Sequence, residues 1–355
     1  MKGIILHGGH GTRLRPLTHT GPKQLLPIAN KPMSQYCIES LRDAGITDIA
    51  IIIGGVGSNK VREYYGNGSS FGVNITFIEQ DEPRGIAHAI NLCKNFVNKE
   101  KFVVFLGDNI MTRPINDLVK KFEKSDMDSL LLLCNVDNPS QFGIAEIQGD
   151  KIIKITEKPK NPKSNLAVTG IYFFTHNLFN ILPNLRPSWR NELEIADALQ
   201  IMIDEKKEIN FELITEFWKD TGTPDDIINA NTIILENIKT YNSEKNNNIS
   251  QNPDNILIGS NTILDKNCQI IGPVLIGNNC KISSKTIIGP NVTVGDNCIL
   301  SNCKIQNSII MSNCTIDSEI DIEKSIIAYN CKILQNSSLT DTHKFLLGEG
   351  TTLSL

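Results

Sequence analysis

An aliphatic side chain recurs at every sixth position between residues 258 and 300. The positions are Ile258, Leu264, Ile270, Ile276, Ile282, Ile288, Val294 and Leu300. If aliphatic residues filled about a quarter of all positions, such a run would have odds on the order of 10⁻⁵ per register, so the period is not accidental. A six-residue period indicates one short strand per repeat and three repeats per coil. We therefore predict a left-handed parallel β-helix here.

The same period predicts which side chains stack inside the β-helix. Thr262, Cys280 and Cys298 are each one coil of eighteen residues apart and should lie above one another in the interior, where the two cysteines act as filler. The phase slips after Leu300 and resumes with Ile310. We therefore expect an irregular corner near 301–309 and an end of the coil stack by about residue 340.

The N-terminal half alternates strand and helix patterns. The apolar runs 3–6 and 102–106 are typical of buried strands. Further strands are expected at 49–53 and 73–78, and helices at 58–65 and 85–94. Asn30 is expected to cap another helix, which Gly45 ends. This repeated unit predicts an α/β fold with a Rossmann-like domain and a mainly parallel sheet.

Composition suggests where the two domains meet. Residues 240–255 are polar, rich in Asn, Lys and Ser, and lack periodicity, which is typical of a linker. We therefore predict a first domain at 1–239, a linker at 240–255 and the β-helix domain at 256–355.

Three glycines follow the first expected strand. Gly8, Gly9 and Gly11 let the backbone turn sharply and present N–H groups to an anion, and Arg13 and Lys23 add positive charge nearby. The loop lacks the Gly-Lys-Ser/Thr of a P-loop and the third glycine of a dinucleotide fingerprint. Without the basic residues, an ordinary glycine-rich turn would be an equally good reading. With them, the loop predicts a polyphosphate site.

Two aspartates stand where a ligand site is expected. Asp108 directly follows the strand 102–106, and in open α/β sheets ligands bind at that edge, so Asp108 should face the same crevice as the glycine loop. An ordinary turn aspartate is the alternative reading. Asp220 precedes a helix that Thr223 can cap and Pro224 can start.

Charge and cysteine usage exclude several classes of function. The net charge of −4 and the pI near 5.9 argue against nucleic acid or an acidic membrane surface as the main partner. No apolar run resembles a signal peptide or a membrane span, so a cytoplasmic location is expected. The nine cysteines include no C-x-x-C, which favours reduced, buried thiols over disulfides or a zinc site.

Several motifs in order resemble one family, the sugar-1-phosphate nucleotidylyltransferases, and most closely the long-form glucose-1-phosphate thymidylyltransferases with a C-terminal hexapeptide-repeat domain. The matching segments are Gly8 to Pro16, Lys23 to Pro27, Asn30 to Pro32, Gly85 to Ala89, Gly107 to Asn109, Glu157 to Pro159, Glu192 to Ile195, Trp218 to Gly222 and Leu347 to Glu349. They cover nearly the whole chain.

The resemblance implies a reaction and its nucleotide site. A nucleotidyl group would pass from dTTP to glucose-1-phosphate, with Mg²⁺ held by Asp108 and Asp220 and with Arg13 and Lys23 as catalytic residues. The implied nucleotide-binding residues are Gly8, Gly9, Gly11, Thr12, Arg13, Gln24, Gln80, Gly85 and Asp108. The amide of Gln80 would pair with the O4 and N3–H edge of the pyrimidine.

The same resemblance implies which residues bind the sugar phosphate. Glu157 would accept sugar hydroxyls, Gly143 would allow close approach, and Lys158 and Arg190 would hold the sugar's phosphate. One methyl group separates dTTP from UTP, so a UTP-using uridylyltransferase is the first alternative. A bifunctional enzyme with an acyltransferase site in the β-helix is the second, although residues 256–340 contain no histidine to act as base.

Some positions depart from the family pattern or have a simpler reading. His7 stands where a small residue is usual and could crowd or hydrogen-bond the nucleotide, and Asn191 and Ala196 replace the usual Gly and Thr. His88 is expected to pack its helix against the rest of the domain, and Trp218 is expected to form part of the core or a pocket wall.

We also expect a homo-oligomer that assembles through the β-helix. Deleting residues 250–355 should then change the oligomeric species but spare turnover.

Overall fold

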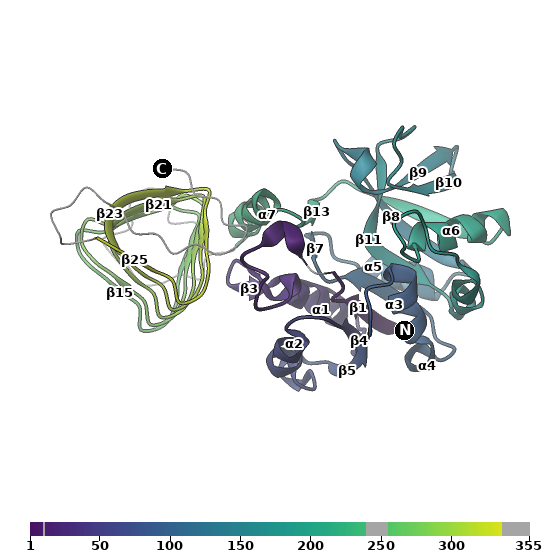
Figure 1. Ribbon diagram of the computed structural model, residues 1–355, viewed down its shortest axis with the longest axis horizontal. Coiled ribbons are helices and arrows are strands. Elements are labelled where there is room, and N and C mark those ends of the chain that lie inside the picture. The colour runs from purple at the N-terminus through teal and green to yellow at the C-terminus, as the bar shows by residue number, and fades with distance from the viewer. Residues whose placement is uncertain (10, 239–254, 336–355) are drawn as a thin grey trace. The chain divides into compact units, whose positions relative to one another are not determined.

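The computed structural model describes residues 1–9, 11–238 and 255–335 (Figure 1). These residues fall into two compact units. The first unit comprises Met1–Gly11, Thr18–Leu25 and Met33–Asp220, and the second comprises Thr12–Leu17, Leu26–Pro32 and Thr221–Leu355. The chain thus leaves the first unit at 220 rather than at the expected boundary of 239, and the expected linker lies outside the described residues apart from residue 255.

Four parallel strands form the part of the first unit's sheet that positions the site. They are β1 (Lys2–Leu6), β4 (Asp48–Ile53), β5 (Asn74–Glu79) and β6 (Phe102–Leu106), in the order β6-β1-β4-β5. Leu6 pairs with Leu106 on one side and with Ile52 on the other. The strands therefore end together, and the strand order reverses beside β1, which is where α/β sheets bind ligands. The predicted Rossmann-like domain with parallel pairing is confirmed.

The rest of this sheet contains both antiparallel and parallel pairs. The added strands are β8 (Ser129–Asn135), β9 (Gly143–Gln148), β10 (Lys151–Glu157), β11 (Leu166–Phe174) and β12 (Ile209–Ile214). β11 joins β6 antiparallel and also pairs with β8 and β9. The insertion between β10 and β11 starts at the end of β10, so Glu157 lies at a strand terminus.

Helices cover both faces of the sheet (Figure 1). On one face lie α1 (Met33–Asp43), α2 (Ser58–Tyr65) and α5 (Asn116–Glu123), and on the other α3 (Ile86–Leu92), α4 (Lys94–Val97) and α6 (Ile195–Asp204). Their apolar residues form two separate cores, one around Ile38 and Phe122 and one around Ile90 and Leu199. The strands lie between these two cores and are buried on both faces. This burial explains the continuous apolar runs in the sequence.

The expected helix cap at Asn30 is wrong. Residues Pro27–Ile28 (β2) and Lys31–Pro32 (β3) form a two-stranded hairpin, and Ala29 and Asn30 turn it with φ of 48° and 59°. Asparagine tolerates this left-handed conformation better than most residues, so its preference for turns wins over its preference for caps. The side chain of Asn30 donates instead to the carbonyl of Val294, 2.7 Å away, within the second unit.

The expected cap at Thr223 is confirmed. Helix α7 (Pro224–Glu236) begins with Pro224, and the Thr223 hydroxyl accepts from the Asp226 N–H at 3.3 Å while the Asp226 carboxylate accepts from the Thr223 N–H at 2.9 Å. This reciprocal capping box satisfies two N–H groups that a helix N-terminus leaves open.

Parallel strands from 256 to 334 stack into coils of a β-helix, as the six-residue period predicted. Its strands are β14 (Ile256–Ile258), β15 (Ile263–Leu264), β16 (Gln269–Ile270), β17 (Val274–Ile276), β18 (Lys281–Ile282), β19 (Ile287–Ile288), β20 (Val292–Val294), β21 (Ile299–Gln306), β22 (Ile309–Ile310), β23 (Thr315–Glu323), β24 (Ile326–Ile327) and β25 (Lys332–Leu334). Ile258 pairs with Ile276 and Ile276 with Val294, a spacing of eighteen residues.

The interior and the irregular corner also follow the prediction. The Thr262 hydroxyl accepts from the backbone N–H of Cys280, and the Cys280 and Cys298 thiols each contact a carbonyl of the following coil. Val294 pairs with Ile310, so this coil is shorter, and the register of β21 shifts between Ser301 and Cys303. The predicted end of the stack lies outside the described residues.

One outer face of the β-helix is buried against α7 within the second unit. Thr293 points outward, between the inward-facing Val292 and Val294, yet is fully buried. The side-chain oxygen Oδ1 of Asn231, on α7, accepts from the Thr293 hydroxyl at 2.8 Å and from the Ala29 N–H at 2.9 Å. Asn231 therefore fastens the hairpin, α7 and the β-helix to one another. Of the helices that the structure describes, none has the length and apolarity needed to cross a membrane.

Candidate active site

The glycine loop and Asp108 leave adjacent strands at the same edge of the sheet. The N–H of Gly107, after β6, donates to the carbonyl of Leu6, at the end of β1, at 2.9 Å. Gly8 and Gly9 are exposed there, and Gly9 has a φ of 92°, which favours glycine. As expected, the loop and Asp108 open onto one edge.

A short two-stranded ladder brings Asp220 to this edge from more than a hundred residues away. Strand β13 (Trp218–Asp220) pairs antiparallel with β7 (Asn109–Met111), which directly follows Asp108, and Asp220 lies opposite Asn109. The two carboxylates thus come from neighbouring positions of one ladder.

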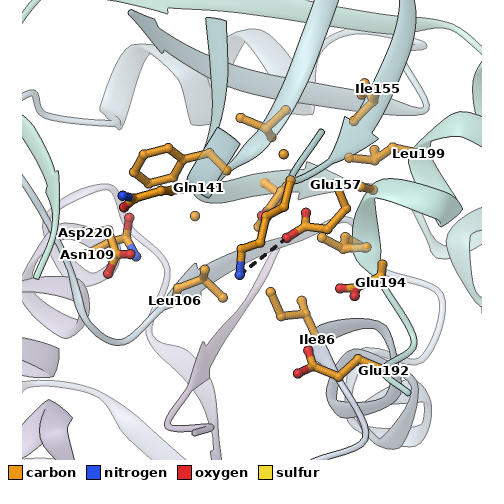
Figure 2. A pocket seen from close by; sticks show the side chains of 18 of the residues that line it. Ile86, Leu106, Asn109, Gln141, Ile155, Glu157, Glu192, Glu194, Leu199 and Asp220 are labelled. Carbon is orange, nitrogen blue, oxygen red and sulfur yellow. Dashed lines mark ion pairs between the residues drawn. The ribbon is translucent and has the colours of Figure 1, made fainter. Parts of the chain in front are cut away.

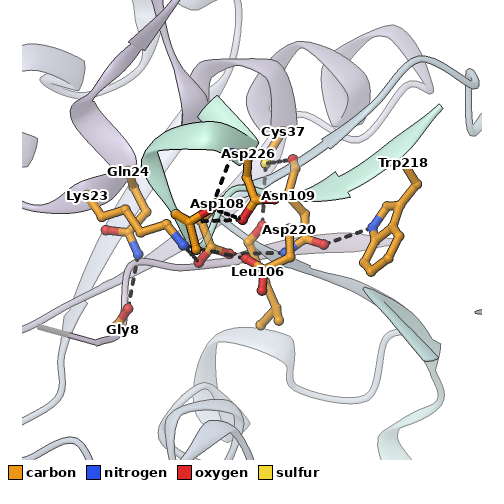
Figure 3. A network of polar contacts seen from close by, with 11 residues as sticks. Gly8, Lys23, Gln24, Cys37, Leu106, Asp108, Asn109, Trp218, Asp220 and Asp226 are labelled. Carbon is orange, nitrogen blue, oxygen red and sulfur yellow. Dashed lines mark hydrogen bonds and ion pairs between the residues drawn. The ribbon is translucent and has the colours of Figure 1, made fainter. Parts of the chain in front are cut away.

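Lys23 lies between the two aspartates (Figure 3). Its Nζ is 2.6 Å from Asp108 Oδ2 and 3.5 Å from Asp220 Oδ1, and its side chain is 8% exposed. Burial alone would raise the pKa of Asp108, but the charge and hydrogen bond of Lys23 outweigh it and lower that pKa below its ordinary value. Asp108 is therefore ionised at neutral pH.

Asn109 and Trp218, which lie in the matching segments but were not among the predicted site residues, orient Asp108. The Trp218 indole N–H donates to Asn109 Oδ1 at 2.8 Å, and Asn109 Nδ2 donates to Asp108 Oδ1 at 3.0 Å (Figure 3). A Cβ added at Gly170 would lie 2.8 Å from Asn109 Nδ2, so glycine leaves the room this amide needs. Trp218 is also core and pocket wall, as expected, because it is 9% exposed and packs edge-on against Phe142.

A pocket in the first unit opens beside Asp220 (Figure 2). It encloses about 740 Å³ not filled by protein atoms, part of it open to solvent. Four predicted sugar-phosphate residues line it together with Asp220: Gly143, Glu157, Lys158 and Arg190. A Cβ added at Gly143 would lie 3.1 Å from Glu157 Oε2, so glycine keeps this wall clear.

The charges in this pocket are already paired. Arg190 lies 3.4 Å from Glu157, 2.9 Å from Glu192 and 3.4 Å from Glu194, and Lys158 lies 3.9 Å from Glu157 (Figure 2 shows this pair). Burial, and then the neighbouring Glu194, raise the pKa of Glu157, while Lys158 and Arg190 lower it less. Glu194 is 3% exposed and was not among the predicted site residues. A phosphate would have to compete with these carboxylates for Arg190.

Comparison with known families identifies the family of this chain. A family described as "Nucleotidyl transferase" matches residues 2–237, and one described as "GMPPB C-terminal domain" matches residues 270–354. The chain belongs to the nucleotidyl transferase family.

Relatives of this nucleotidyltransferase share its full length. The low-salt glycan biosynthesis nucleotidyltransferase Agl11 of Haloferax volcanii is 39% identical over 361 aligned positions, covering all of both chains. A glucose-1-phosphate thymidylyltransferase of Streptomyces antibioticus is 37% identical over 357 positions, covering all of this chain and 99% of the relative. A crystal structure of a provisionally assigned Bacillus anthracis glucose-1-phosphate thymidylyltransferase, in complex with a sucrose, is 40% identical with a TM-score of 0.63, covering 68% of this chain and 98% of that one.

Two residues near the nucleotidyltransferase's glycine loop lie behind it rather than on its surface. Gln24 is 1% exposed, and its Nε2 donates to the Gly8 carbonyl at 3.0 Å, so it supports the loop. His7 is 3% exposed and packs edge-on against Tyr65, with ring centroids 6.2 Å apart. Burial, only partly opposed by Asp108, lowers the pKa of His7 to about 3. The ring is therefore neutral.

The other predicted nucleotide residues fall into two groups. Gln80 and Gly85 lie together in the first unit, where Gln80 Nε2 donates to the Gly85 carbonyl at 3.4 Å. Gly85 has a φ of 102°, and a Cβ there would lie 2.5 Å from the Leu193 carbonyl oxygen, so only glycine fits. Thr12 and Arg13 are exposed and belong to the second unit, where the Arg13 guanidinium lies against Gly222.

The donor set at Asp108 and Asp220 suits Mg²⁺. Both carboxylates reach the same nitrogen of Lys23, so they are close enough to share one cation. Among the residues that the structure describes, no group of three or more His, Cys, Asp or Glu side chains could hold a metal ion. Two carboxylates are what Mg²⁺ usually takes from a protein when phosphate oxygens and water complete its shell.

Proposed function

We propose that this nucleotidyltransferase transfers a nucleotidyl group from dTTP to glucose-1-phosphate and releases pyrophosphate. The observation that carries the proposal is the convergence of Asp108, Asp220 and Lys23 at the sheet edge, with Asp220 also lining the pocket that contains Glu157 and Arg190. The cluster of Asp108, Asp220 and Lys23 is suited to binding phosphate and a metal ion. It adjoins a pocket whose carboxylates can accept hydrogen bonds from sugar hydroxyls. The named relatives support the same reaction class.

The reaction is a single in-line displacement. An oxygen of the sugar phosphate attacks the α-phosphorus, a new P–O bond forms there, and the bond from the α-phosphorus to the bridging oxygen breaks as pyrophosphate leaves. Such a reaction needs positioning and charge neutralisation more than covalent help. The exposed N–H groups of Gly8 and Gly9 suit the triphosphate, and the Lys23 ammonium suits the charge that develops on its oxygens. By the family resemblance, Gly11 and Thr12 would bind the nucleotide, and Arg13 would neutralise charge on the leaving pyrophosphate.

Asp108 and Asp220 would hold Mg²⁺. When bound, Mg²⁺ neutralises negative charge on the triphosphate oxygens. The Asn109 and Trp218 hydrogen bonds fix the orientation of Asp108 before any ligand arrives. Lys23, which contacts both aspartates, would then turn its ammonium toward the phosphate oxygens.

The pocket would take the sugar. Glu157 would accept hydrogen bonds from sugar hydroxyls above Gly143, and Lys158 and Arg190 would hold the phosphate. Arg190 would exchange one of its carboxylate partners for a phosphate oxygen. Because Asn191 and Ala196 depart from the family pattern in this segment, the identity of the sugar is the least constrained part of the proposal.

Gln80 would select the base. Its amide can accept from N3–H and donate to O4, an edge that thymine and uracil share. The thymine methyl is worth about 1–3 kcal/mol at best, so we expect dTTP to be preferred and UTP to be accepted. A UTP-using uridylyltransferase is therefore the second candidate.

We also propose that the enzyme works in the cytoplasm as a homo-oligomer assembled through the β-helix. Ile263 and Ile299 are 65% and 45% exposed on one outer column of the coils, with Lys281 between them. Exposed aliphatic side chains on a regular surface favour self-association.

A panel of substrates tests the proposed reaction. Pyrophosphate release is measured with dTTP, UTP, CTP, GTP and ATP against glucose-, galactose-, mannose- and N-acetylglucosamine-1-phosphate. The expected order is dTTP, then UTP, then the others, with glucose-1-phosphate best. Faster turnover of a purine nucleotide than of both dTTP and UTP would show that the role of Gln80 is wrong. Incubation with acetyl-CoA and hexosamine phosphates tests the acyltransferase alternative.

A further inference from the structure

His88 contacts the amide that would select the base. It lies in the first turn of α3, four residues after Arg84, and its Nδ1 is 2.8 Å from Gln80 Nε2. Gln80 is 8% exposed, and its backbone N–H donates to the Ile53 carbonyl at 2.8 Å. The expectation that His88 only packs its helix leaves this contact unexplained.

The chemistry of the contact fixes which way the Gln80 amide faces. An amide nitrogen can only donate, so Nδ1 of His88 must be the acceptor and the ring must be the neutral tautomer with its proton on Nε2. The carbonyl of Gly85, which can only accept, also faces Gln80 Nε2, at 3.4 Å. The Gly85 carbonyl decides the orientation, because turning the amide over would place Oε1 against that carbonyl whichever ring nitrogen of His88 carries the proton.

The surroundings of His88 keep it neutral. Burial, and then the positive charge of Arg84, lower its pKa, and only Asp81 opposes them. Asp81 is itself paired with Arg84 at 2.7 Å, which weakens its pull on the imidazole. An acceptor at Nδ1 is thus available at neutral pH.

We propose that His88 is a positioning residue that sets nucleotide specificity by holding the Gln80 amide in one orientation. With Nε2 held by His88 and Gly85, Oε1 is the atom presented to the base, so of the two hydrogen bonds proposed for Gln80 this arrangement keeps acceptance from N3–H and not donation to O4. Thymine and uracil offer an N3–H donor to that oxygen, whereas cytosine offers a bare N3 acceptor, which Oε1 repels. The inference rests on the proposed function, in which Gln80 meets the base. It predicts that His88 separates dTTP and UTP from CTP but does not separate dTTP from UTP.

Three substitutions test the role. His88→Leu removes the acceptor, His88→Asn can keep an acceptor oxygen near the position of Nδ1, and Gln80→Leu removes the amide itself. The readout is the ratio of kcat/KM for dTTP to kcat/KM for CTP, with the dTTP to UTP ratio as internal control. We expect His88→Leu to lower the first ratio by about tenfold or more, because a site that hydrogen-bonds its substrate discriminates strongly. The second ratio should not change, and His88→Asn should recover most of the loss.

Distinct outcomes would overturn the inference or the proposed function. A folded His88→Leu variant with an unchanged dTTP to CTP ratio would overturn the inference, and so would equal losses in His88→Leu and His88→Asn, because the acceptor would then not matter. His88→Ala replaces His88→Leu if the latter does not fold. If the unaltered enzyme makes no nucleotide sugar from dTTP or UTP, the proposed function fails. If Gln80→Leu abolishes the preference and His88→Leu does not, only the inference about His88 fails.

Discussion

Lys23 Nζ lies 2.6 Å from Asp108 Oδ2, although 85 residues separate the two in the chain. The ammonium also reaches Asp220 at 3.5 Å, so one buried cation contacts two carboxylates. A lysine at this position is therefore part of the fold as well as of the proposed chemistry.

Lys23→Met should destabilise the protein in a pH-dependent way. Removing one partner of a fully buried ion pair costs about 3–5 kcal/mol, and we expect about 1–3 kcal/mol here because Asp220 is 31% exposed. Lys23 lowers the folded-state pKa of Asp108, and the resulting stability is present above the unfolded pKa of about 3.9 and lost as pH falls through the folded value. The deficit in Lys23→Met should therefore be full at neutral pH and shrink as pH falls below about 3.9. Urea unfolding at about pH 7 and about pH 3 measures it, and an equal deficit at both would contradict the pairing.

Asp108→Asn and Asp220→Asn should each lower kcat/KM by roughly 10²-fold or more, since each removes a carboxylate from the proposed metal site. Higher Mg²⁺ should partly restore the rate. The matched control is Asp150→Asn, an exposed aspartate in the turn after β9, which should keep full activity. Pyrophosphate release across a Mg²⁺ titration provides the measurement. Either variant with unchanged turnover and unchanged Mg²⁺ dependence would exclude that aspartate from the centre.

Arg190→Met should leave Glu157, Glu192 and Glu194 without their shared cation. Burial already raises the pKa values of Glu157 and Glu194, and loss of Arg190 should raise them further. A raised carboxylate pKa favours the folded state at low pH, and that advantage is lost as pH rises through the folded value. The Tm deficit of Arg190→Met should thus grow as pH rises above the unfolded carboxylate pKa of about 4.3, and KM for the sugar phosphate should rise more than KM for the nucleotide.

The control for this variant is Arg42→Met, because Arg42 pairs with the exposed Asp43. Its Tm deficit should be small and independent of pH. If the two variants show the same pH dependence, Arg190 does not hold the pocket's carboxylates together.

Asn231→Leu should lower the free energy of unfolding by about 1–3 kcal/mol, since it leaves the buried Ala29 N–H and Thr293 hydroxyl without their shared acceptor. Asn237→Ala, at the exposed end of α7, serves as control and should change stability by less than about 0.5 kcal/mol. Denaturant unfolding monitored by circular dichroism compares them. Equal effects would mean that Asn231 does not fasten α7 to the coils.

Deleting residues 250–355 should change the species seen by light scattering. The burial of Thr293 and Ile309 on the outer face of the coils shows that α7 and the hairpin would also lose a packing partner. We therefore expect lower stability of the remaining chain in addition to altered assembly. An unchanged oligomeric species would contradict assembly through the β-helix.

Sequence patterns correctly predicted the elements that depend on residues close together in the chain. The apolar run before Gly107, the aliphatic period after residue 258 and the cap at Thr223 each depend on residues a few positions apart, and each lies where expected. The helix cap at Asn30 failed because the same residue is also a good turn former, and the hairpin it turns contacts Val294, far along the chain.

Contacts between distant residues account for what the motifs missed. Asn109 matters because Trp218, more than a hundred residues away in the chain, reaches it across the β7–β13 ladder. His88 matters because α3 returns to the end of β5, where Gln80 stands. None of these pairings has a spacing that a repeat or a motif would reveal. The site's residue types were readable from the sequence, whereas the partners that orient them were not.

Radiolabelled dTTP tests the central claim most directly. The enzyme is incubated with glucose-1-phosphate and Mg²⁺, and with dTTP labelled at either the α- or the γ-phosphate, and the products are separated. Attack at the α-phosphorus predicts that the α label appears in a nucleotide sugar and the γ label in pyrophosphate. Transfer of the γ label to the sugar, or no labelled nucleotide sugar from either dTTP or UTP, would contradict the account.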